Sequence, residues 1–374
     1  MSAGRRVLFL VDGLASGGLE RQLALLATSL PLGWRPLVWS AGGGPFLNVL
    51  RDAGVPVIVD RRRARLDPRP FARLARLIAC RRPDIVHGWN WMPASVAAPV
   101  CRAAGIPYVD GTIRLGRPNP EFGRPRRSVM FLASTVVANS QAGLDAWGVR
   151  APKGRVIYNA FDSGRLATLA TVTASGSANG KAGRPFTAVM TGRMHKHKDF
   201  ASVLTAARIL ASSTPAGTWR FLLVGDGPRR ADLEREAADL TQAGVVDFVA
   251  PGLEVLPIVA GADVGVLMTD DALHAEGCSN SIMEYMACGL PVVCCDSGGN
   301  RELVTEGVSG LLVGSGDAAG LARRLEELRV SLRGATMGAV GRERLLHEFT
   351  VARMVDSYRD VYRACLGERD QRMV

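Results

Sequence analysis

The sequence lacks any long apolar run, although 47% of its 374 residues are hydrophobic. A helix that crosses a bilayer needs about 18 or more consecutive apolar residues. The opening stretch "MSAGRRVLFLVDG" leads directly into a strand-like run and a glycine turn. We therefore expect no signal peptide and no transmembrane helix, and the composition leaves enough apolar residues for the cores of two ordinary domains.

The sequence also lacks a cysteine or histidine pattern that would bind a metal. Its seven cysteines form no C-x-x-C pair and have no histidines at metal-binding spacing. The H-x-H run at 195–197 has a lysine at its centre and another directly after it, which disfavours a bound cation. We therefore expect no metal cofactor, and a reduced, cytoplasmic chain.

Acidic residues are scarce in the first half of the chain. Residues 1–160 contain 23 Lys and Arg but 9 Asp and Glu, a net charge of +14, whereas the remainder contains 23 and 26, a net charge of −3. A basic half can face anionic lipid, nucleic acid or an acidic ligand. Because the sequence has no helix-turn-helix, zinc-finger or RNA-recognition signature, we expect no nucleic-acid partner.

Short β-branched runs alternate with helical patterns along the chain, such as "LERQLALLATSL" at 19–30. This rhythm predicts an α/β protein with two Rossmann-like, doubly wound parallel sheets that face a cleft. A stretch rich in Gly, Ala, Ser and Thr places the boundary within 163–184. We predict an N-terminal domain over 1–163 and a C-terminal domain over 184–349. The candidate strands are 7–11, 36–39, 55–59, 84–87, 106–109 and 135–138 in the first half, and 186–191, 219–224, 245–249, 263–267 and 290–295 in the second.

The last helical pattern covers about 345–366 and has a continuous apolar face. Such a face needs an apolar surface to cover. We therefore predict that the C-terminal segment 350–374 packs back on the N-terminal domain.

The stretch "EGCSNSIMEYMACGLPVV" (276–293) places Glu276 before a helix start and Glu284 near that start. Ser281 and Glu284 fit a capping box, which is a structural interpretation. It leaves Glu276 and the polar run 277–280 unexplained. Unpaired N–H groups at a helix N-terminus can hold a phosphate, and flanking carboxylates would then have to face hydroxyl groups. A nucleoside diphosphate sugar has its diphosphate between two sets of hydroxyl groups.

A pair of cations follows the strand-like run "FTAVMT" in the turn "GRMHKHKDF". Arg193 and Lys198 are either solvated loop charges or part of a site, because ligands of doubly wound sheets bind at the carboxyl ends of the strands. A guanidinium and an ammonium group that converge there would neutralise a departing diphosphate.

Two features of the first half are candidates for the same site. The loop in "DGLASGGLERQ" (12–22) is either a tight turn without a ligand or a close approach to donor phosphate or acceptor. Its Gly17–Gly18 pair lacks the G-x-G-x-x-G spacing of a dinucleotide site. His87, followed by Asn90, ends the strand-like run "DIVH"; a lone histidine is often structural, but this position makes it a candidate site residue.

Two basic stretches combine arginines with apolar residues, "RRRARLDPRPFARLARLIACRR" (61–82) and "IRLGRPNPEFGRPRRSVMF" (113–131). The first predicts either an ordinary helix with a solvated arginine face or a surface that docks on anionic lipid. Each charge near an anionic membrane contributes about 1 kcal/mol.

Several motifs follow one another from the end of the first half onward. They are "VIYNAFD" (156–162), "GRMHKHK" (192–198), "LLVGDGPRRADLE" (222–234), "EVLPIVAGADVGVLMT" (254–269) and "EGCSNSIMEYMACGLPVV" (276–293). Together they resemble the retaining, nucleotide-sugar-dependent glycosyltransferases with the GT-B fold, the large group that includes sucrose synthase and the phosphatidylinositol mannosyltransferases. The resemblance covers about 156–313, and the first half matches only in organisation.

The resemblance implies a metal-independent enzyme that transfers a hexose from a nucleoside diphosphate sugar to a glycan or lipid-linked acceptor. UDP-sugars are favoured as donors and GDP-mannose is compatible. It further implies a place in cell-surface polysaccharide or glycolipid synthesis, with the enzyme peripheral on the inner face of the plasma membrane.

The same resemblance implies roles for individual residues. Arg193 and Lys198 would contact the donor diphosphate, and Glu276 the transferred sugar. His87 is carried over as a further catalytic residue. Glu284 would bind the ribose, and the loop around Leu253 and Glu254 the base. The implied donor-binding residues are Gly17, Gly18, Leu253, Glu254, Gly277, Cys278, Ser279, Asn280 and Glu284.

The chain departs from the family pattern at three positions. Tyr158 and Ala160 stand where proline and glycine are common, and Ala250 stands where glycine usually precedes the base loop. Two alternatives remain open, a nucleotide-sugar epimerase of the same fold and a non-catalytic subunit that binds sugar nucleotides and docks on membranes.

Overall fold

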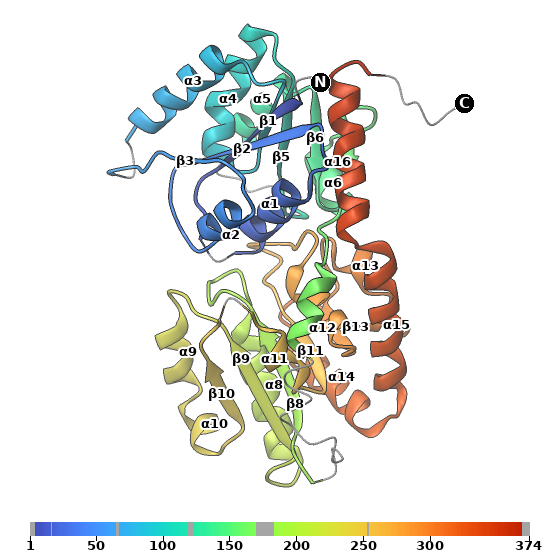
Figure 1. Cartoon of the computed structure of the whole chain (residues 1–374). Helices are drawn as coiled ribbons and strands as arrows, with labels where there is room; N and C mark the ends of the chain where they lie inside the picture. The colour runs from blue at the N-terminus through green and yellow to red at the C-terminus, as the bar shows by residue number, and fades with distance from the viewer. Residues whose placement is uncertain are drawn as a thin grey trace, which may run out of the picture. The chain divides into compact units, whose positions relative to one another are not determined.

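The computed structural model describes residues 4–15, 17–64, 67–117, 123–169, 183–252 and 254–368. These residues form two compact units. Unit 1 comprises residues 4–114, 123–160 and 351–368, and unit 2 comprises 161–350 together with 115–117. Each unit is a parallel sheet with helices on both faces (Figure 1), so the predicted α/β class with two Rossmann-like domains is confirmed.

The sheet of unit 1 has seven parallel strands in its described residues, in the order β3-β2-β1-β4-β5-β6-β7. The order turns at β1, as expected for a doubly wound sheet. The strands are β1 Arg5–Val11, β2 Trp34–Ser40, β3 Val57–Val59, β4 Ile85–Gly88, β5 Tyr108–Ile113, β6 Thr135–Ala138 and β7 Gly154–Val156.

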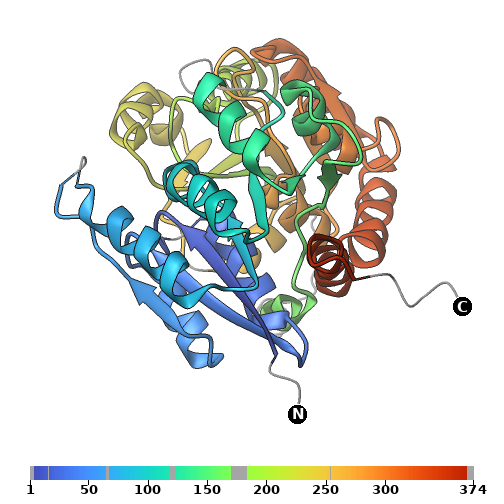
Figure 2. The ribbon, with the colours of Figure 1, turned by 90° about the horizontal axis from the view of Figure 1, so that it is seen from above.

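Side chains of the central strand β1 alternate between two apolar cores. Val7 and Phe9 point to one face, whereas Leu8 and Leu10 point to the other, and all four are buried. The first face is covered by α1 Gly18–Ser29, α2 Phe46–Asp52 and α16 Val351–Cys365. The second is covered by α3 Arg69–Arg81, α4 Trp91–Ala104, α5 Gly123–Leu132 and α6 Gln141–Trp147; Figure 2 shows α3 and α4 side by side.

The C-terminal helical pattern divides into two helices, α15 Arg333–Glu348 in unit 2 and α16 in unit 1. The single helix expected from about 345 onward is therefore wrong at its start, because the chain leaves helical geometry at Phe349. Helix α16 buries Tyr358 and Tyr362 in the core that it shares with α1.

The sheet of unit 2 has six parallel strands in the described part of the chain, in the order β10-β9-β8-β11-β12-β13. The strands are β8 Phe186–Thr191, β9 Trp219–Val224, β10 Val246–Val249, β11 Val264–Leu267, β12 Val292–Cys295 and β13 Gly310–Val313. The remaining helical elements are the 3-10 turn η2 Ser163–Leu166, α8 Phe200–Ser213, α9 Arg230–Glu236, α10 Ala238–Gln242, α11 Leu256–Ala260, α12 Asn280–Ala287, α13 Asn300–Leu303 and α14 Ala318–Val330. Among the described residues, no helix combines the length and the apolar character needed to cross a membrane.

Candidate functional site

The predicted site residues of unit 2 lie on loops that leave neighbouring strands. Strand β8 leads into the loop with Arg193 and Lys198, and the adjacent β11 leads into the loop with Glu276. An antiparallel bridge between Lys198 and Thr269 joins the two loops. Because both follow carboxyl ends of parallel strands, they lie at the edge where doubly wound sheets bind ligands.

Helix α12 is fixed to this edge by the hydroxyl group of Tyr285. That hydroxyl accepts a hydrogen bond from the backbone N–H of Thr191 (2.7 Å) and donates one to the carbonyl of Val266 (3.1 Å). Gly265 leaves room for the ring, since a Cβ there would lie 2.2 Å from Tyr285 Cγ. The helix is therefore tied to both β8 and β11.

The capping-box interpretation of Ser281 and Glu284 is wrong. The N-cap residue of α12 is Ser279, and no side chain caps the helix. The Ser281 hydroxyl instead donates to the carbonyl of Thr191 (3.0 Å), and Glu284 accepts from Arg165 (2.8 Å). The role of Glu284 must therefore be sought outside helix capping.

The chain segment before α12 is buried and has unused donors. The backbone N–H groups of Gly277 and Ser279 make no hydrogen bond within the described residues. The carbonyl of Glu276 accepts from the N–H of Gly299 (2.8 Å), and a Cβ at Gly298, whose φ is +54°, would lie 2.1 Å from that carbonyl oxygen. The segment therefore presents amides at the positive end of a helix, a suitable arrangement for an anion.

Lys198 and Glu276 form an ion pair, with 2.5 Å between Nζ and Oε1. Only 17% of the Lys198 side chain and 11% of the Glu276 side chain are exposed. Burial raises the pKa of Glu276, but the positive charge of Lys198 outweighs it and holds the pKa below its usual value. The two groups that sequence analysis assigned to diphosphate and sugar are thus direct neighbours.

Three imidazole rings stack beside this ion pair. His195 and His197 have ring centroids 4.6 Å apart, and His197 and His274 have theirs 5.1 Å apart. His274 Nε2 lies 3.8 Å from Glu276 Oε1. Burial, together with nearby positive groups, lowers the pKa values of His197 and His274. Within the described residues, no group of His, Cys, Asp or Glu side chains is arranged to hold a metal ion.

Arg193 differs from Lys198 in having no partner among the described side chains. It is exposed and follows Gly192 directly after β8. A Cβ at Gly225, on the loop after β9, would lie 2.0 Å from the Gly192 carbonyl oxygen, so the two loop backbones pack closely. This leaves a fixed loop with a guanidinium group available for an anion.

Arg165, a residue that our sequence analysis did not single out, joins two predicted donor-binding residues. Its Nε and Nη2 donate to the two carboxylate oxygens of Glu254 (2.9 and 2.8 Å), and Nη2 also donates to Glu284 Oε1 (2.8 Å). Burial would lower the pKa of Arg165, but the two carboxylates outweigh it and raise the pKa. Leu253, the other residue predicted at the base loop, lies outside the described residues.

His87 lies in the interior of unit 1. The side chain is fully buried among Trp89, Tyr358 and Tyr362, and Nδ1 lies 2.8 Å from the Tyr362 hydroxyl. Burial lowers the pKa of His87 well below its usual value. The pleat of β4 turns the ring toward α16, and the predicted catalytic role of His87 stays a prediction.

Gly17 and Gly18 lie at the start of α1, with Gly17 as its N-cap. A Cβ at Gly17 would lie 2.3 Å from Oε2 of Glu20, so a carboxylate already occupies this helix terminus. Asn90 is likewise structural here, since its Oδ1 accepts from the backbone N–H of Asp12 (2.9 Å). The predicted contact of Gly17 and Gly18 with donor phosphate stays a prediction.

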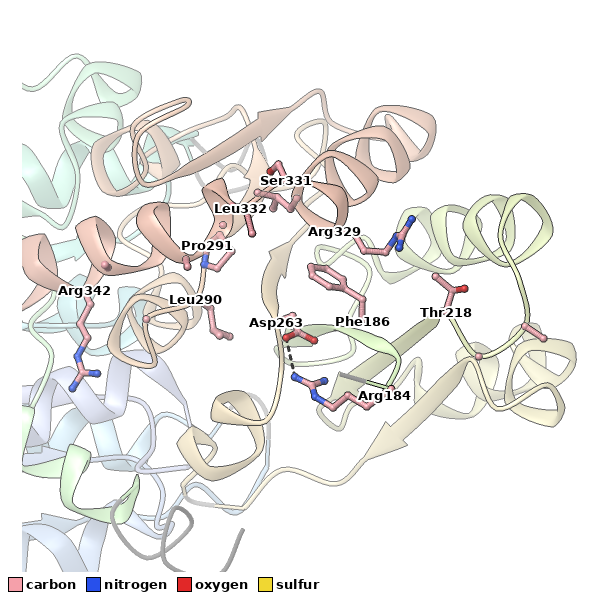
Figure 3. A pocket seen from close by; sticks show the side chains of 18 residues that line it. Arg184, Phe186, Thr218, Asp263, Leu290, Pro291, Arg329, Ser331, Leu332 and Arg342 are labelled. Atoms are coloured by element: carbon pink, nitrogen blue, oxygen red, sulfur yellow. Dashed lines mark hydrogen bonds and ion pairs between the residues drawn. The ribbon is translucent and has the colours of Figure 1, made fainter. Parts of the chain in front are cut away.

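A cavity of about 850 Å³ lies elsewhere in unit 2 and contains none of the predicted residues (Figure 3). Its lining includes Phe186, Thr218, Asp263 and Pro291, which stand at or directly before the first residues of four strands. Figure 3 shows the ion pair between Arg184 and Asp263 (2.8 Å) at its wall. The cavity is therefore at the amino edge of the sheet, opposite the candidate site.

Two family comparisons cover most of the chain. Residues 16–165 match the family described as Glycosyltransferase Family 4, and residues 185–329 match the one described as Glycosyl transferases group 1. The fold and these matches define the class as a GT-B glycosyltransferase. The chain belongs to the glycosyltransferases of the GT-B type.

Curated relatives match parts of the chain. A lipopolysaccharide core biosynthesis glycosyltransferase of Rhizobium meliloti is 33% identical over 169 residues, 45% of this chain and 46% of the relative. A D-inositol 3-phosphate glycosyltransferase of Thermobifida fusca is 26% identical over 318 residues, 75% of this chain and 70% of the relative. The match thus spans about half the length of the first relative.

Solved structures share the fold over nearly the whole chain. The HepE protein of Anabaena, crystallised with UDP and glucose, is 24% identical with a TM-score of 0.79, covering 96% of this chain and 100% of that one. Sucrose-phosphate synthase of Thermosynechococcus elongatus is 19% identical with a TM-score of 0.75, covering 97% and 100%.

Proposed function

We propose that the chain is a retaining glycosyltransferase that moves a sugar from a nucleoside diphosphate sugar to a glycan or lipid-linked acceptor. The observation that carries the proposal is the Lys198–Glu276 ion pair at the carboxyl edge of unit 2, next to the amides before α12. The bond that breaks joins a phosphate oxygen to the sugar. Lys198 can bind the phosphate oxygen while the adjacent Glu276 binds the sugar.

The leaving diphosphate would be held by three kinds of positive group. Arg193 is exposed on its loop, Lys198 is adjacent, and the N–H groups of Gly277 and Ser279 have no partner among the described residues. Charges fixed before the reaction stabilise a developing anion without further reorganisation. We propose that these groups take the part often given to a metal ion, so that transfer needs none.

The carboxylates would bind hydroxyl groups on either side of the diphosphate. Glu276 is buried, which raises its pKa, but the positive charge of Lys198 outweighs burial and keeps the pKa low. The carboxylate therefore stays ionised and can accept hydrogen bonds from sugar hydroxyl groups. Glu284, in the first two turns of α12, would accept from the ribose hydroxyl groups. Ionised acceptors make hydrogen bonds about twice as strong as neutral ones.

Retention follows if both bond changes occur on the same face of the sugar. The anomeric C–O bond to the diphosphate breaks and its electron pair remains on the phosphate oxygen. The acceptor hydroxyl oxygen bonds to the oxocarbenium-like carbon from that face, and its proton passes to the departing phosphate oxygen. No dedicated protein base is then required.

We propose the donor and the acceptor from the chemistry of the site and from the similar proteins. UDP-sugars are favoured because the HepE protein was crystallised with UDP and with UDP-glucose, and GDP-mannose remains compatible with the site. The relative of Rhizobium meliloti acts in lipopolysaccharide core biosynthesis. We therefore favour an acceptor in cell-surface polysaccharide or glycolipid synthesis.

The basic face of α3 supports a peripheral membrane location. Arg69, Arg73 and Arg76 are exposed, whereas Leu74 and Ile78 are buried. Two of these arginines pair with carboxylates, Arg69 with Asp67 and Arg73 with Asp60, so their charge is partly neutralised. Each arginine near an anionic surface contributes about 1 kcal/mol. Sedimentation with vesicles of anionic lipid, lost at high salt and absent with neutral lipid, is the expected result for a protein on the inner face of the plasma membrane.

The deciding experiment compares nucleotides first and transfer second. At 100 times Kd a nucleoside diphosphate should stabilise the protein by about 2.7 kcal/mol, a clear thermal shift. UDP should act more strongly than GDP, and chelation by EDTA should leave the shift unchanged. Transfer to a lipid-linked acceptor should fall sharply in Glu276→Gln, and an isomerised donor in place of transferred sugar would show an epimerase.

A further inference from the structure

Arg165 lies where two proposed nucleoside contacts meet. It stands in η2, where the Asp162 side chain accepts from the N–H of Gly164 (2.9 Å) and fixes the turn. The guanidinium carbon lies 5.3 Å from the centroid of the buried Phe161 ring. Only 13% of the Arg165 side chain is exposed. The turn at Asp162 therefore fixes the backbone of Arg165, and the Phe161 ring packs against one face of its guanidinium group.

The carboxylates that Arg165 joins come from separate elements. Glu254 precedes α11, and its Oε1 also accepts from the backbone N–H of Leu256 (3.0 Å). Glu284 belongs to α12 and has 9% of its side chain exposed. Arg165 donates to both through a single Nη2 and holds Glu254 through a two-bond fork. A planar fork of this kind fixes orientation as well as distance.

Two carboxylates beside a diphosphate site, the buried Glu284 and the partly buried Glu254, raise an electrostatic difficulty. Each repels the other and repels the anionic donor. A single guanidinium between them neutralises one of the two negative charges. The remaining negative charge can accept hydrogen bonds from hydroxyl groups. The same guanidinium sets the distance between the loop before α11 and α12, that is, between the proposed base and ribose contacts.

We propose that Arg165 is a positioning residue for the nucleoside half of the donor, joining the ribose-binding Glu284 to the base loop at Glu254. This inference rests on the proposed function, because it takes a nucleoside diphosphate as the ligand of unit 2. It assigns no contact between Arg165 and the reacting atoms. The ligand part that depends on Arg165 is therefore the nucleoside and not the diphosphate.

The test compares UDP with inorganic pyrophosphate, which has no ribose and no base. Isothermal titration of the full chain should show UDP binding weakened about 10-fold to 100-fold in Arg165→Ala, the range expected when charge-assisted hydrogen bonds are lost. Binding of pyrophosphate, measured in the same way or by competition, should change less than about twofold. In transfer assays KM for the donor should rise while KM for the acceptor stays constant.

Three further variants separate positioning from folding. Arg165→Lys retains the charge but loses the fork, so UDP affinity should be intermediate and the fold retained. In Arg165→Ala/Glu254→Gln, removal of the carboxylate left without its arginine should restore part of the UDP affinity. Arg184→Ala is the matched control, since it breaks another arginine–carboxylate pair of unit 2, at the opposite edge of the sheet.

The outcomes are distinct. If wild-type protein binds neither UDP nor any other nucleoside diphosphate, the proposed function fails and the inference fails with it. If wild-type protein binds UDP but Arg165→Ala and Arg165→Lys bind it equally well, the inference alone is overturned. Equal weakening of UDP and pyrophosphate would also overturn it, since Arg165 would then only maintain the fold.

Discussion

Arg193 and Lys198 are cations of the same loop with different surroundings. Lys198 is paired with Glu276, whereas Arg193 is exposed and has no partner among the described side chains. In the proposed reaction Arg193 would therefore form its main ion pair with the departing diphosphate. An interaction of that kind strengthens as negative charge develops and lowers the barrier to transfer.

The first prediction concerns Arg193→Ala. Turnover should fall on the order of 10²–10³-fold, by analogy with the loss of one donor that stabilises an oxyanion. Steady-state transfer assays at saturating donor measure it. The control is Arg235→Ala on α9, an exposed arginine whose ion pair with Asp232 is on the surface and contributes little. Near-normal turnover of Arg193→Ala would contradict the assignment.

The second prediction concerns the stacked histidines. Burial lowers the pKa values of His197 and His274 in the folded protein, so the unfolded chain takes up protons at higher pH. Above about pH 6.5 these residues add no pH dependence to the free energy of unfolding. As the pH falls below that value, stability should fall by up to about 1.4 kcal/mol per pH unit for His274, and by less for the more solvated His197.

Urea unfolding at pH 7.5, 6.5 and 5.5 measures this slope. His274→Gln should reduce it, while His347→Gln, an exposed position on α15 outside the stack, should leave it unchanged. If the free energy of unfolding has the same pH dependence in the wild type, His274→Gln and His347→Gln, the stack does not resist protonation. The Glu276 carboxylate should stay ionised over this range, because its pKa is held low by Lys198 despite its burial.

At the scale of single elements, α12 shows how the sheet determines the site. Its N-terminus is placed by bonds from Tyr285 and Ser281 to β8 and β11, and no capping side chain contributes. An uncapped helix start keeps its amides available, which is what an anion site needs.

The third prediction is that Tyr285→Phe destabilises unit 2 without creating a cavity. The N–H of Thr191 and the carbonyl of Val266 would lose their buried partner, at a cost of about 1–3 kcal/mol. Denaturant unfolding measures it, and nucleotide affinity should fall as α12 loosens. Tyr108→Phe is a matched control, since the Tyr108 hydroxyl is buried without a partner in the described part of the chain. Equal effects of both substitutions would contradict the argument.

Strands were predicted well wherever a β-branched run was long. The prediction 186–191 coincides with β8 and 219–224 with β9, because β8 is buried along most of its length and β9 is apolar apart from the exposed Arg220. Strand β7, with only three residues, and β13, with the short run "GLLV", were not predicted. Both are short edge strands with few apolar residues, whereas β3, an edge strand of the same length as β7, stood out through the longer apolar run "VPVIV".

Sequence analysis singled out Glu276 and Lys198 from charge and turn chemistry, and the structure places the two side chains in direct contact. Arg165 was not predictable, because its partners Glu254 and Glu284 are 89 and 119 residues away along the chain. The full burial of His87 was not predictable either, because a strand pattern does not specify which face an apolar-flanked histidine occupies when both faces are buried. Tertiary contacts decide both cases.

At the scale of the whole molecule, unit 1 is completed by a helix from the far end of the chain. Helix α16 contributes Met354, Val355, Tyr358, Val361 and Tyr362 to the core that contains β1 and α1. Burial of each such side chain contributes about 1.5–3 kcal/mol, and a whole domain is typically stable by about 5–15 kcal/mol.

The fourth prediction is that a chain ending at Thr350 keeps unit 2 folded but loses unit 1. Hydrogen exchange should show protection in β8, β9 and β11 and near-random exchange in β1 and β4. A chain ending at Glu368, which retains α16, is the control and should match the full-length protein in both units. Protection of β1 in the shorter chain would show that the sheet of unit 1 is stable without α16.

The position of α16 also sets an order of events during synthesis. A ribosome adds about 5–20 residues per second, and domains usually acquire structure in the order in which they emerge. If unit 1 requires α16, as the fourth prediction states, its first 160 residues wait for residues 351–365, while the intervening segment can already form its own sheet. The domain that begins the polypeptide is thus the last to mature, and a nascent chain that stalls late would expose one aromatic-rich sheet face to chaperones.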